Sequence, residues 1–256
     1  MQLPPSLLQP PPAAEAAFAD INLVRLRQRG IVTHDSGRTS VAEDFRIIKR
    51  QLLKDARSAA GGAGQRGNLV VVTSALPGEG KTFCAINLAM SISMEKDARA
   101  LLVDADVARP SVLRVLGLEA ERGLMDVLLN GSTDLSDVIM RTNVPSLSLL
   151  PAGRASRHAT ELLASRNMSH LLEELASRYP DRIIIFDSPP LLLTTEASVL
   201  VSQMGQVVMV VEAETTTQVA VKEALSRIDH SPSINLIYNK SRAFPGVEYY
   251  GYGYYE

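Results

Sequence analysis

The chain contains little cysteine, few aromatic residues and no excess of basic charge. Its 256 residues include one cysteine, Cys84, so no internal disulfide can form and the composition suits a reducing compartment. Tryptophan is absent, and aromatic residues make up 5% of the sequence. The formal net charge of −2 argues against a nucleic-acid-binding protein, which would carry a basic excess. What remains is an ordinary globular composition with 46% hydrophobic and 21% charged residues.

Long hydrophobic runs are also missing from the sequence. No apolar stretch approaches the roughly 20 residues that are needed to span a bilayer. The first residues, MQLPPSLLQPPPAAEAA, lack a basic stretch and are interrupted by prolines, which argues against a signal peptide. We therefore expect a cytoplasmic protein, for which any role at a membrane depends on a partner.

Composition and periodicity divide the chain into four segments. Residues 1–37 are rich in proline at the start, which we expect to be extended or disordered, and basic further on, where three arginines fit a solvated helix face better than a docking surface. Residues 38–67 contain an amphipathic helix from about 41 to 58 and a glycine-rich link. Residues 68–240 form the core, and residues 241–256 form a flexible tail rich in tyrosine.

Short apolar runs alternate with longer amphipathic segments throughout the core. Nearly continuous β-branched runs are typical of strands that are buried on both faces of a parallel sheet. The alternation predicts a doubly wound α/β domain with a mostly parallel sheet, helices on both faces, and ligands at the carboxyl ends of the strands. We expect short helices over that edge within 110–129. The expected strands are 69–74, 100–104, 147–153, 182–187, 206–213 and 234–240, and the expected helices are 81–95, 159–178, 195–204 and 216–229.

The segment ALPGEGKT, residues 75–82, lies between an expected strand and an expected helix, as a phosphate-binding loop does. Ala75 stands where such loops have their first glycine. Two later glycines let backbone N–H groups converge on phosphate oxygens, and the helix adds its positive N-terminus. Lys81 would bridge the β- and γ-phosphates, and Thr82 would bind Mg²⁺. The expected nucleotide contacts are Pro77, Gly78, Glu79, Gly80, Lys81, Thr82 and Phe83.

Two expected strand ends supply carboxylates at the edge where this loop lies. LLVDADVARP ends a strand with Asp104 and Asp106, and IIIFDSPP ends another strand with Asp187. An aspartate at a strand end is usually a turn former or a helix cap. Three of them beside a phosphate loop favour a metal and acid–base set, because carboxylate oxygens are the ligands that Mg²⁺ prefers.

Together these motifs resemble those of the bacterial tyrosine autokinases of exopolysaccharide synthesis, known as BY-kinases. The resemblance covers about residues 38–256. ALPGEGKT corresponds to the Walker A motif, LLVDAD to Walker A′, IIIFDSPP to Walker B, and YYGYGYYE to the terminal tyrosine cluster. The segment EDFRIIKRQLL is similar to that of the autokinases associated with exosortase-type polysaccharide loci. The family fold is that of the P-loop NTPases of the Min/Par-like type.

The resemblance implies an autokinase that uses ATP and Mg²⁺. Lys81 and Thr82 would bind them, Asp106 and Asp187 would help to hold the metal, and Asp104 would orient or deprotonate the attacking tyrosine. Which aspartate binds the metal and which is the base stays open. Asn239 would contact the adenine, although a cap at the strand end explains it equally well. The implied acceptors are Tyr249, Tyr250, Tyr252, Tyr254 and Tyr255, which the resemblance places in the active site of the next subunit of a ring.

The sequence departs from the family pattern at two places. The family has arginine two residues after the second aspartate of Walker A′, where this chain has Ala108 followed by Arg109. The oligomer-forming helix of the family carries Glu-x-x-Arg-x-x-Arg. Glu43 and Arg46 match this motif, and Lys49 takes its third position with Arg50 directly after it. Lysine keeps the charge but loses the bidentate fork, and an ordinary solvated helix is the alternative for this segment.

The resemblance also implies partners. A transmembrane polysaccharide co-polymerase or chain-length protein would recruit the kinase to the inner face of the cell membrane and activate it, and a tyrosine phosphatase would reverse its action. Two other functions compete. A Min/Par-type ATPase switch shares the fold but carries a second lysine in KGGxGK[ST], where this chain has Leu76. The other alternative is a non-catalytic ATP-binding scaffold of a polysaccharide machine, and the intact Lys81 and Asp104 argue against it.

Overall fold

The computed structural model describes residues 17–37, 39–59, 66–129, 133–178, 181–228 and 232–241. The proline-rich start and all five tyrosines of the expected acceptor cluster lie outside these residues, so the predictions made for them stay predictions. Within the described part of the chain, no helix is long and apolar enough to cross a membrane.

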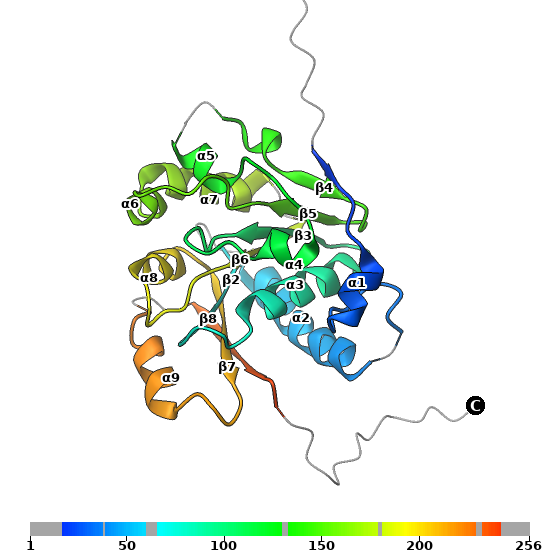
Figure 1. Ribbon diagram of the computed structural model, residues 1–256. Coiled ribbons are helices and arrows are strands. Elements are labelled where there is room, and N and C mark those ends of the chain that lie inside the picture. Colours follow the sequence, from blue (N-terminus) through cyan, green and yellow to red (C-terminus); the bar gives the residue numbers. More distant parts are fainter. Residues whose placement is uncertain are drawn as a thin grey trace, which may run out of the picture.

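The described residues form one mostly parallel sheet. Its strands are β1 (Phe18–Ala19), β2 (Leu69–Ser74), β3 (Arg99–Asp104), β4 (Met140–Thr142), β5 (Leu147–Leu150), β6 (Arg182–Asp187), β7 (Gln206–Glu212) and β8 (Ser233–Asn239). The eight strands follow the order β1-β4-β5-β3-β6-β2-β7-β8, and every neighbouring pair is parallel except β4 and β5 (Figure 1). Since β2 lies within the sheet and later strands add on both sides of it, the predicted doubly wound, mostly parallel sheet is confirmed.

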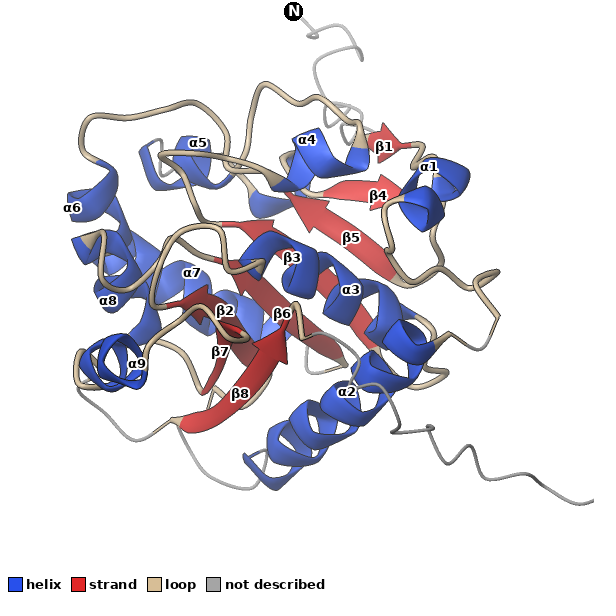
Figure 2. Cartoon of the chain, turned by 60° about the horizontal axis from the view of Figure 1, so that its bottom comes forward, coloured by secondary structure: helices blue, strands red, loops and turns tan. Residues whose placement is uncertain are grey.

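Helices cover both faces of this sheet. They are α1 (Leu23–Gln28), α2 (Ser40–Ala59), α3 (Lys81–Ser93), α4 (Val112–Leu116), α5 (Leu124–Leu129), α6 (Ala159–Leu163), α7 (Arg166–Arg178), α8 (Thr195–Val201) and α9 (Gln218–Leu225). One core cluster joins the sheet to α1 through α4, and a second joins the opposite face to α5 through α9. Figure 2 shows α2 and α3 across one face and α7 beyond the other. Two buried layers therefore hold the strand ends in place.

The structure departs from the expected elements at three places. β1 and β4 were not predicted because two and three residues are too few to show an apolar alternation. The single helix expected over 159–178 is two helices, α6 and α7. They separate at Ser165, whose backbone N–H donates to the Leu162 carbonyl at 3.1 Å and whose hydroxyl accepts from the Met168 N–H at 3.3 Å. A serine that caps a new helix explains this break.

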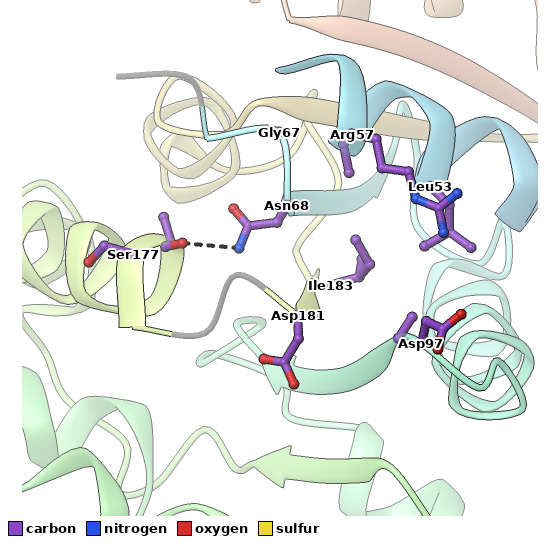
Figure 3. A pocket seen from close by; sticks show the side chains of 11 residues that line it. Leu53, Arg57, Gly67, Asn68, Asp97, Ser177, Asp181 and Ile183 are labelled. Carbon is purple, nitrogen blue, oxygen red and sulfur yellow. Dashed lines mark hydrogen bonds between the residues drawn. The ribbon is translucent and has the colours of Figure 1, made fainter. Parts of the chain in front are cut away.

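A pocket of about 320 Å³ opens at the edge of the sheet where β2 begins. Figure 3 shows it between the C-terminal part of α2, which contributes Leu53 and Arg57, and the end of α7, which contributes Ser177. Asn68 closes one side, where its side-chain amide donates to the carbonyl oxygens of Ala176 and Arg182, each at 3.3 Å. Because the phosphate-loop segment follows the other end of β2, this pocket and that segment lie at opposite edges of the sheet.

Candidate active site

The phosphate-loop segment connects the end of β2 at Ser74 to the start of α3 at Lys81. Gly78 and Gly80 have φ angles of 85° and 98°, in the left-handed region that glycine adopts without steric cost. Gly80 is also the N-cap residue of α3. The first N–H groups of a helix have no partner within the helix, and its N-terminus carries partial positive charge. The local structure is therefore suited to bind phosphate oxygens.

Glu79 holds this loop in place with its side chain. The residue is 1% exposed, and its carboxylate accepts hydrogen bonds from the Leu76 N–H at 2.6 Å, from the Glu212 N–H at 3.3 Å and from the hydroxyl of Thr216. The carboxylate thus joins the loop to the end of β7 instead of facing a ligand. Only the backbone of Glu79 remains for the predicted nucleotide contact.

Asn239 supports the same loop from β8. Its side-chain amide donates to the Glu79 carbonyl at 2.8 Å. A Cβ atom built on Gly80 would lie 2.1 Å from the Asn239 Nδ2 atom, which is closer than real atoms approach. Asn239 therefore acts as a tie between a strand end and the loop backbone, and its predicted contact with adenine stays a prediction.

Replacement of Gly80 by alanine is expected to destabilise the protein by about 2–3 kcal/mol. The left-handed conformation costs a non-glycine residue about 1–2 kcal/mol, and displacing Asn239 removes a hydrogen bond worth about 1 kcal/mol. Chemical denaturation would measure this loss. The control is Gly37→Ala, at φ 64° with open space around its Cβ position, which should lose only the conformational part. Equal losses for the two variants would contradict the close contact with Asn239.

Asp104 and Asp187 lie side by side on β3 and β6, and each is 1% exposed. The Thr82 hydroxyl donates to Asp187 Oδ2 at 2.6 Å and lies 2.7 Å from the Ser111 hydroxyl. Asp104 Oδ2 accepts from the backbone N–H groups of Ser111 and Val112, at 2.9 and 3.0 Å, and so caps α4. The Oδ1 atom of each aspartate is buried without a hydrogen-bond partner. Two unpaired carboxylate oxygens thus lie at the edge where α3 begins, beside Thr82 in its first turn.

Burial strongly affects the protonation of these two carboxyls. It raises the pKa of Asp104 to about 6, although the N–H groups of Val112 and Ser111 act in the opposite direction. The pKa of Asp187 is also raised, mainly by burial and further by the Asp104 charge, against the hydrogen bond from Thr82 and the Lys81 charge. Buried anions that lack a partner are unfavourable. The pair would therefore gain from a nearby cation.

The residues at this edge of the sheet fit Mg²⁺. The ion binds hard oxygen donors and usually takes one or two carboxylates together with substrate phosphates. In the described part of the chain, no group of three or more His, Cys, Asp or Glu side chains is placed to hold a metal ion. A site that shares the ion between Thr82, Asp187 and a nucleotide agrees with this finding. When bound, Mg²⁺ would neutralise charge on the phosphates that react.

Asp106 and Lys81 complete the set of predicted catalytic groups. Asp106 is half-buried, and its Oδ1 atom accepts from the Arg109 N–H at 3.1 Å. Burial raises its pKa, while that hydrogen bond and the charges of Lys81 and Arg109 lower it. Arg109 therefore lowers the pKa of Asp106, although it stands one residue later than the arginine of the family pattern. Among the described carboxylates none forms an ion pair with Lys81, so its ammonium remains available to a phosphate.

The protein without metal or nucleotide is expected to be more stable with asparagine at position 104. The folded-state pKa of Asp104 lies above its ordinary value of 3.8, so the aspartate reduces the free energy of unfolding as pH rises from about 4 to above 6. Two pKa units correspond to about 3 kcal/mol, or about 5–10 °C in unfolding temperature. Asparagine keeps an oxygen for the two N–H groups of α4. Thermal unfolding in EDTA should show this gain at pH 8 and a shrinking gain toward pH 4. A pH-independent difference would contradict the buried charge.

The predicted interface residues on α2 do not share one face. Glu43 and Arg46 form an ion pair on the outside of the helix. Lys49 is 6% exposed and points inward, where its ammonium donates to the Ser91 carbonyl at 2.9 Å and pairs with Glu95 at 2.6 Å. The prediction of Lys49 as an interface residue is therefore wrong, because its charge is used within the chain.

Sequence reasoning missed the contribution of Ser111. Its hydroxyl contacts Thr82, and its backbone N–H binds Asp104, so it links the loop to the end of β3. The signal was present, since a serine directly before the apolar residues VLRVL is typical of a helix start. The expectation of short helices in this region is confirmed by α4 and α5.

Comparison with known proteins relates this geometry to a family. A family model described as an AAA domain matches residues 68–239. The putative tyrosine-protein kinase EpsB of Ralstonia nicotianae is 32% identical over 188 residues, covering 73% of this chain and 24% of that protein. The tyrosine-protein kinase YwqD of Bacillus subtilis is 30% identical over 229 residues, which cover 88% of this chain and 92% of that one. The chain belongs to the bacterial tyrosine kinase family.

Solved structures share the fold of this chain. The crystal structure of the chimerical protein CapA2B2 matches it with a TM-score of 0.67 at 27% identity, covering 84% of this chain and 97% of that one. The septum site-determining protein MinD of Pyrococcus horikoshii, at 24% identity and a TM-score of 0.53 over 65% of this chain and 67% of that one, shares the fold alone. The fold is thus that of the Min/Par-like P-loop ATPases. This chain spans about a quarter of the length of the Ralstonia relative.

Proposed function

We propose that this chain is a protein-tyrosine kinase that transfers the γ-phosphate of ATP, with Mg²⁺, to the tyrosines of its own C-terminal cluster. The observation that carries this proposal is the placement of Lys81, the Thr82–Asp187 pair and the unpaired Oδ1 atom of Asp104 at one edge of the sheet. Membership of the tyrosine kinase family supports the choice of tyrosine as the acceptor.

In this proposal the loop and the acidic strand ends have separate tasks. The backbone from Pro77 to Phe83 and the Lys81 ammonium would hold the phosphates, and Thr82 and Asp187 would hold Mg²⁺, with Asp106 nearby. A bond forms between the tyrosine oxygen and the γ-phosphorus while the bond from that phosphorus to the β–γ bridging oxygen breaks, and ADP leaves. The phenol proton passes to Asp104, whose raised pKa makes it a better proton acceptor than an ordinary carboxylate.

We also propose that α2 forms the contact between subunits of a ring, with Arg50 in place of Lys49. Glu43, Arg46, Ile47 and Arg50 follow the i, i+3, i+4, i+7 spacing of one helix face. Ile47 is 60% exposed and Arg50 is exposed, whereas the opposite face of α2 packs on α3. Arginine offers the bidentate fork that carboxylates of a neighbouring subunit would bind. Within such a ring, the tail of one subunit would enter the active site of the next.

The setting of this activity follows from the family resemblance. A transmembrane co-polymerase or chain-length protein would bring the kinase to the inner face of the membrane and activate it, a phosphatase would remove the phosphates, and the cycle would regulate exopolysaccharide synthesis. The tyrosine cluster provides up to five acceptors for this cycle.

A mixing experiment tests both the reaction and its direction. A Lys81→Met chain keeps its tyrosines, and a second chain with all five tail tyrosines changed to phenylalanine keeps its active site. Mixed with ATP and Mg²⁺, the pair should produce phosphotyrosine on the Lys81→Met chain only. If the wild-type protein becomes phosphorylated on tyrosine but neither chain in the mixture does, the phosphate is transferred within one chain. No phosphotyrosine in either sample, with or without the membrane activator, would refute the kinase proposal.

A further inference from the structure

The loop after β5 brings two arginines to the edge of the sheet where the candidate active site lies. β5 and β3 are parallel neighbours, so the chain leaves β5 at the edge where β3 ends in Asp104. Arg154 and Arg157 lie in this loop, and both side chains are exposed. Neither has a task in the reaction proposed above. We call residues 153–158 the arginine loop.

The start of the arginine loop is packed closely against α5. The N–H groups of Leu124 and Met125 donate to the carbonyl oxygens of Pro151 and Ala152, at 2.8 and 3.0 Å. Gly153 has a φ angle of 79°, and a Cβ atom there would lie 2.3 Å from Asp126 Oδ2. The loop therefore leaves the sheet along a fixed path.

A buried carboxylate positions the first arginine. Asp126 is 6% exposed, and its Oδ2 atom accepts from the N–H groups of Gly123 and Arg154, at 2.9 and 3.3 Å. Its Oδ1 atom lies 3.9 Å from Arg154 Nε, while the Arg154 side chain is 70% exposed. Burying a carboxylate is unfavourable unless it is paired. Here the buried charge orders an arginine whose guanidinium still reaches solvent, which is a prepared surface for an anion.

The far end of the loop is tied to the elements around Asp106. The Thr160 hydroxyl, just after the loop, donates to Glu196 Oε1 at 2.6 Å, and Glu196 lies in the first turn of α8. Glu196 is close enough to Asp106 for its charge to raise the pKa of that carboxyl. The arginine loop therefore runs between the end of β5 and the surroundings of Asp106.

We propose that Arg154 and Arg157 bind a phosphotyrosine of the C-terminal cluster from a second copy of this chain while another tyrosine of that cluster occupies the active site. This inference rests on the proposed kinase function and extends it to the choice of substrate. Guanidinium groups bind phosphate oxygens through paired hydrogen bonds. Each phosphorylation adds about −1.5 to −2 charges to its tyrosine. One modified tyrosine would thus retain the tail for the next transfer.

The sequence of the tail complements the arginine loop. No basic residue follows Arg242, while Glu248 and Glu256 flank the five tyrosines. The tyrosines are one or two residues apart, so an extended tail offers acceptors at steps of about 3.5–7 Å from any phosphate already bound. The same site therefore favours a tail that carries one phosphate over a tail that carries none.

Peptide binding tests this preference directly. The probes are fluorescent peptides of residues 241–256, one unmodified and one phosphorylated at Tyr252, at about 0.15 M salt, where exposed charge pairs are partly screened. The binding protein is the full chain with its five tail tyrosines changed to phenylalanine. We expect it to bind the phosphorylated peptide about tenfold more tightly. Arg154→Ala/Arg157→Ala should abolish that preference. Arg57→Ala, at the opposite edge of the sheet (Figure 3), should retain it.

The outcomes separate this inference from the proposed function. Equal affinity for the two peptides, or a preference that survives in the double arginine variant, would overturn the role of the arginine loop. Phosphotyrosine formation by wild-type protein is scored separately, so the kinase can stand while this inference fails. If wild-type protein forms no phosphotyrosine but the preference depends on both arginines, the binding site stands and the kinase proposal fails.

Discussion

Replacement of Lys81 by methionine is expected to reduce the rate of tyrosine phosphorylation by at least about 10²–10³-fold. Such factors are typical when one group that stabilises the charge of a transition state is removed. The fold should be unaffected, because Lys81 is half-buried and no described carboxylate pairs with it. The measurement is the initial rate of phosphotyrosine formation with Mg-ATP, together with the thermal unfolding temperature of each variant.

The matched control for this prediction is Lys96→Met. Lys96 is exposed just after the C-terminal end of α3, whereas Lys81 begins the same helix, so both variants lose one positive charge near one helix. We expect the control to retain the wild-type rate within about twofold. A similar rate for both variants would place the phosphate contact elsewhere. A large loss of stability in Lys81→Met would mean that the lysine has a structural role.

The second large effect concerns two adjacent residues of α2. Lys49→Glu is expected to destabilise the protein by about 3–5 kcal/mol, as removal of one partner of a buried ion pair does. The new carboxylate would face the Ser91 carbonyl and the Glu95 side chain, which Lys49 binds in the structure. The partial exposure of Glu95, at 40%, favours the lower end of that range. Equilibrium unfolding in urea measures the loss.

Arg50→Glu makes the same kind of change one residue later, on the outer face. Because Arg50 is exposed, we expect its unfolding free energy to stay within about 0.5 kcal/mol of the wild-type value. Its assembly, followed by light scattering with Mg-ATP, should weaken if the outer face of α2 forms the ring contact. If Arg50→Glu strongly destabilised the protein, or if Lys49→Glu left the free energy of unfolding unchanged, the assignment of Lys49 to the inner face and Arg50 to the outer face would be contradicted.

The helix register explains why the motif alone misled the prediction at Lys49. An α-helix has 3.6 residues per turn, so the residue seven positions after Glu43 returns to nearly the same face, whereas the residue six positions after it does not. Arg50 is the seventh and Lys49 the sixth. The family spacing corresponds to Lys49, whereas helical geometry places Arg50 on the same face as Glu43. The inward orientation of Lys49 depends on its hydrogen bond to the Ser91 carbonyl of α3, a residue that is distant in sequence.

The strands of the core were predictable because they are long and buried on both faces. Burial from Leu69 through Ser74 is complete, and the short β-branched apolar run at its start, LVVV, is typical of a strand that is buried on both faces. The tight turn of the phosphate loop was also predictable, because few residues other than glycine adopt the positive φ angles that it requires. β1 could not be predicted, because Phe18–Ala19 pairs with β4 through contacts more than 120 residues away.

The side-chain ties around the site were less predictable than its motifs. Glu79 was expected among the nucleotide contacts, yet its carboxylate binds the end of β7, and Asn239 reaches the same loop from β8. These hydrogen bonds join segments that are distant in sequence, so no local sequence pattern predicts them. The position of Asp126 under the arginine loop is of the same kind.

The central claim is that the active-site edge transfers phosphate to tyrosine. The most direct measurement is mass spectrometry of the purified wild-type chain after incubation with ATP and Mg²⁺, with its membrane activator added in a parallel sample. The account predicts phosphotyrosine within residues 249–255, and none in the Lys81→Met chain under the same conditions. Release of inorganic phosphate with no phosphotyrosine in any sample would contradict it and would indicate an ATPase switch.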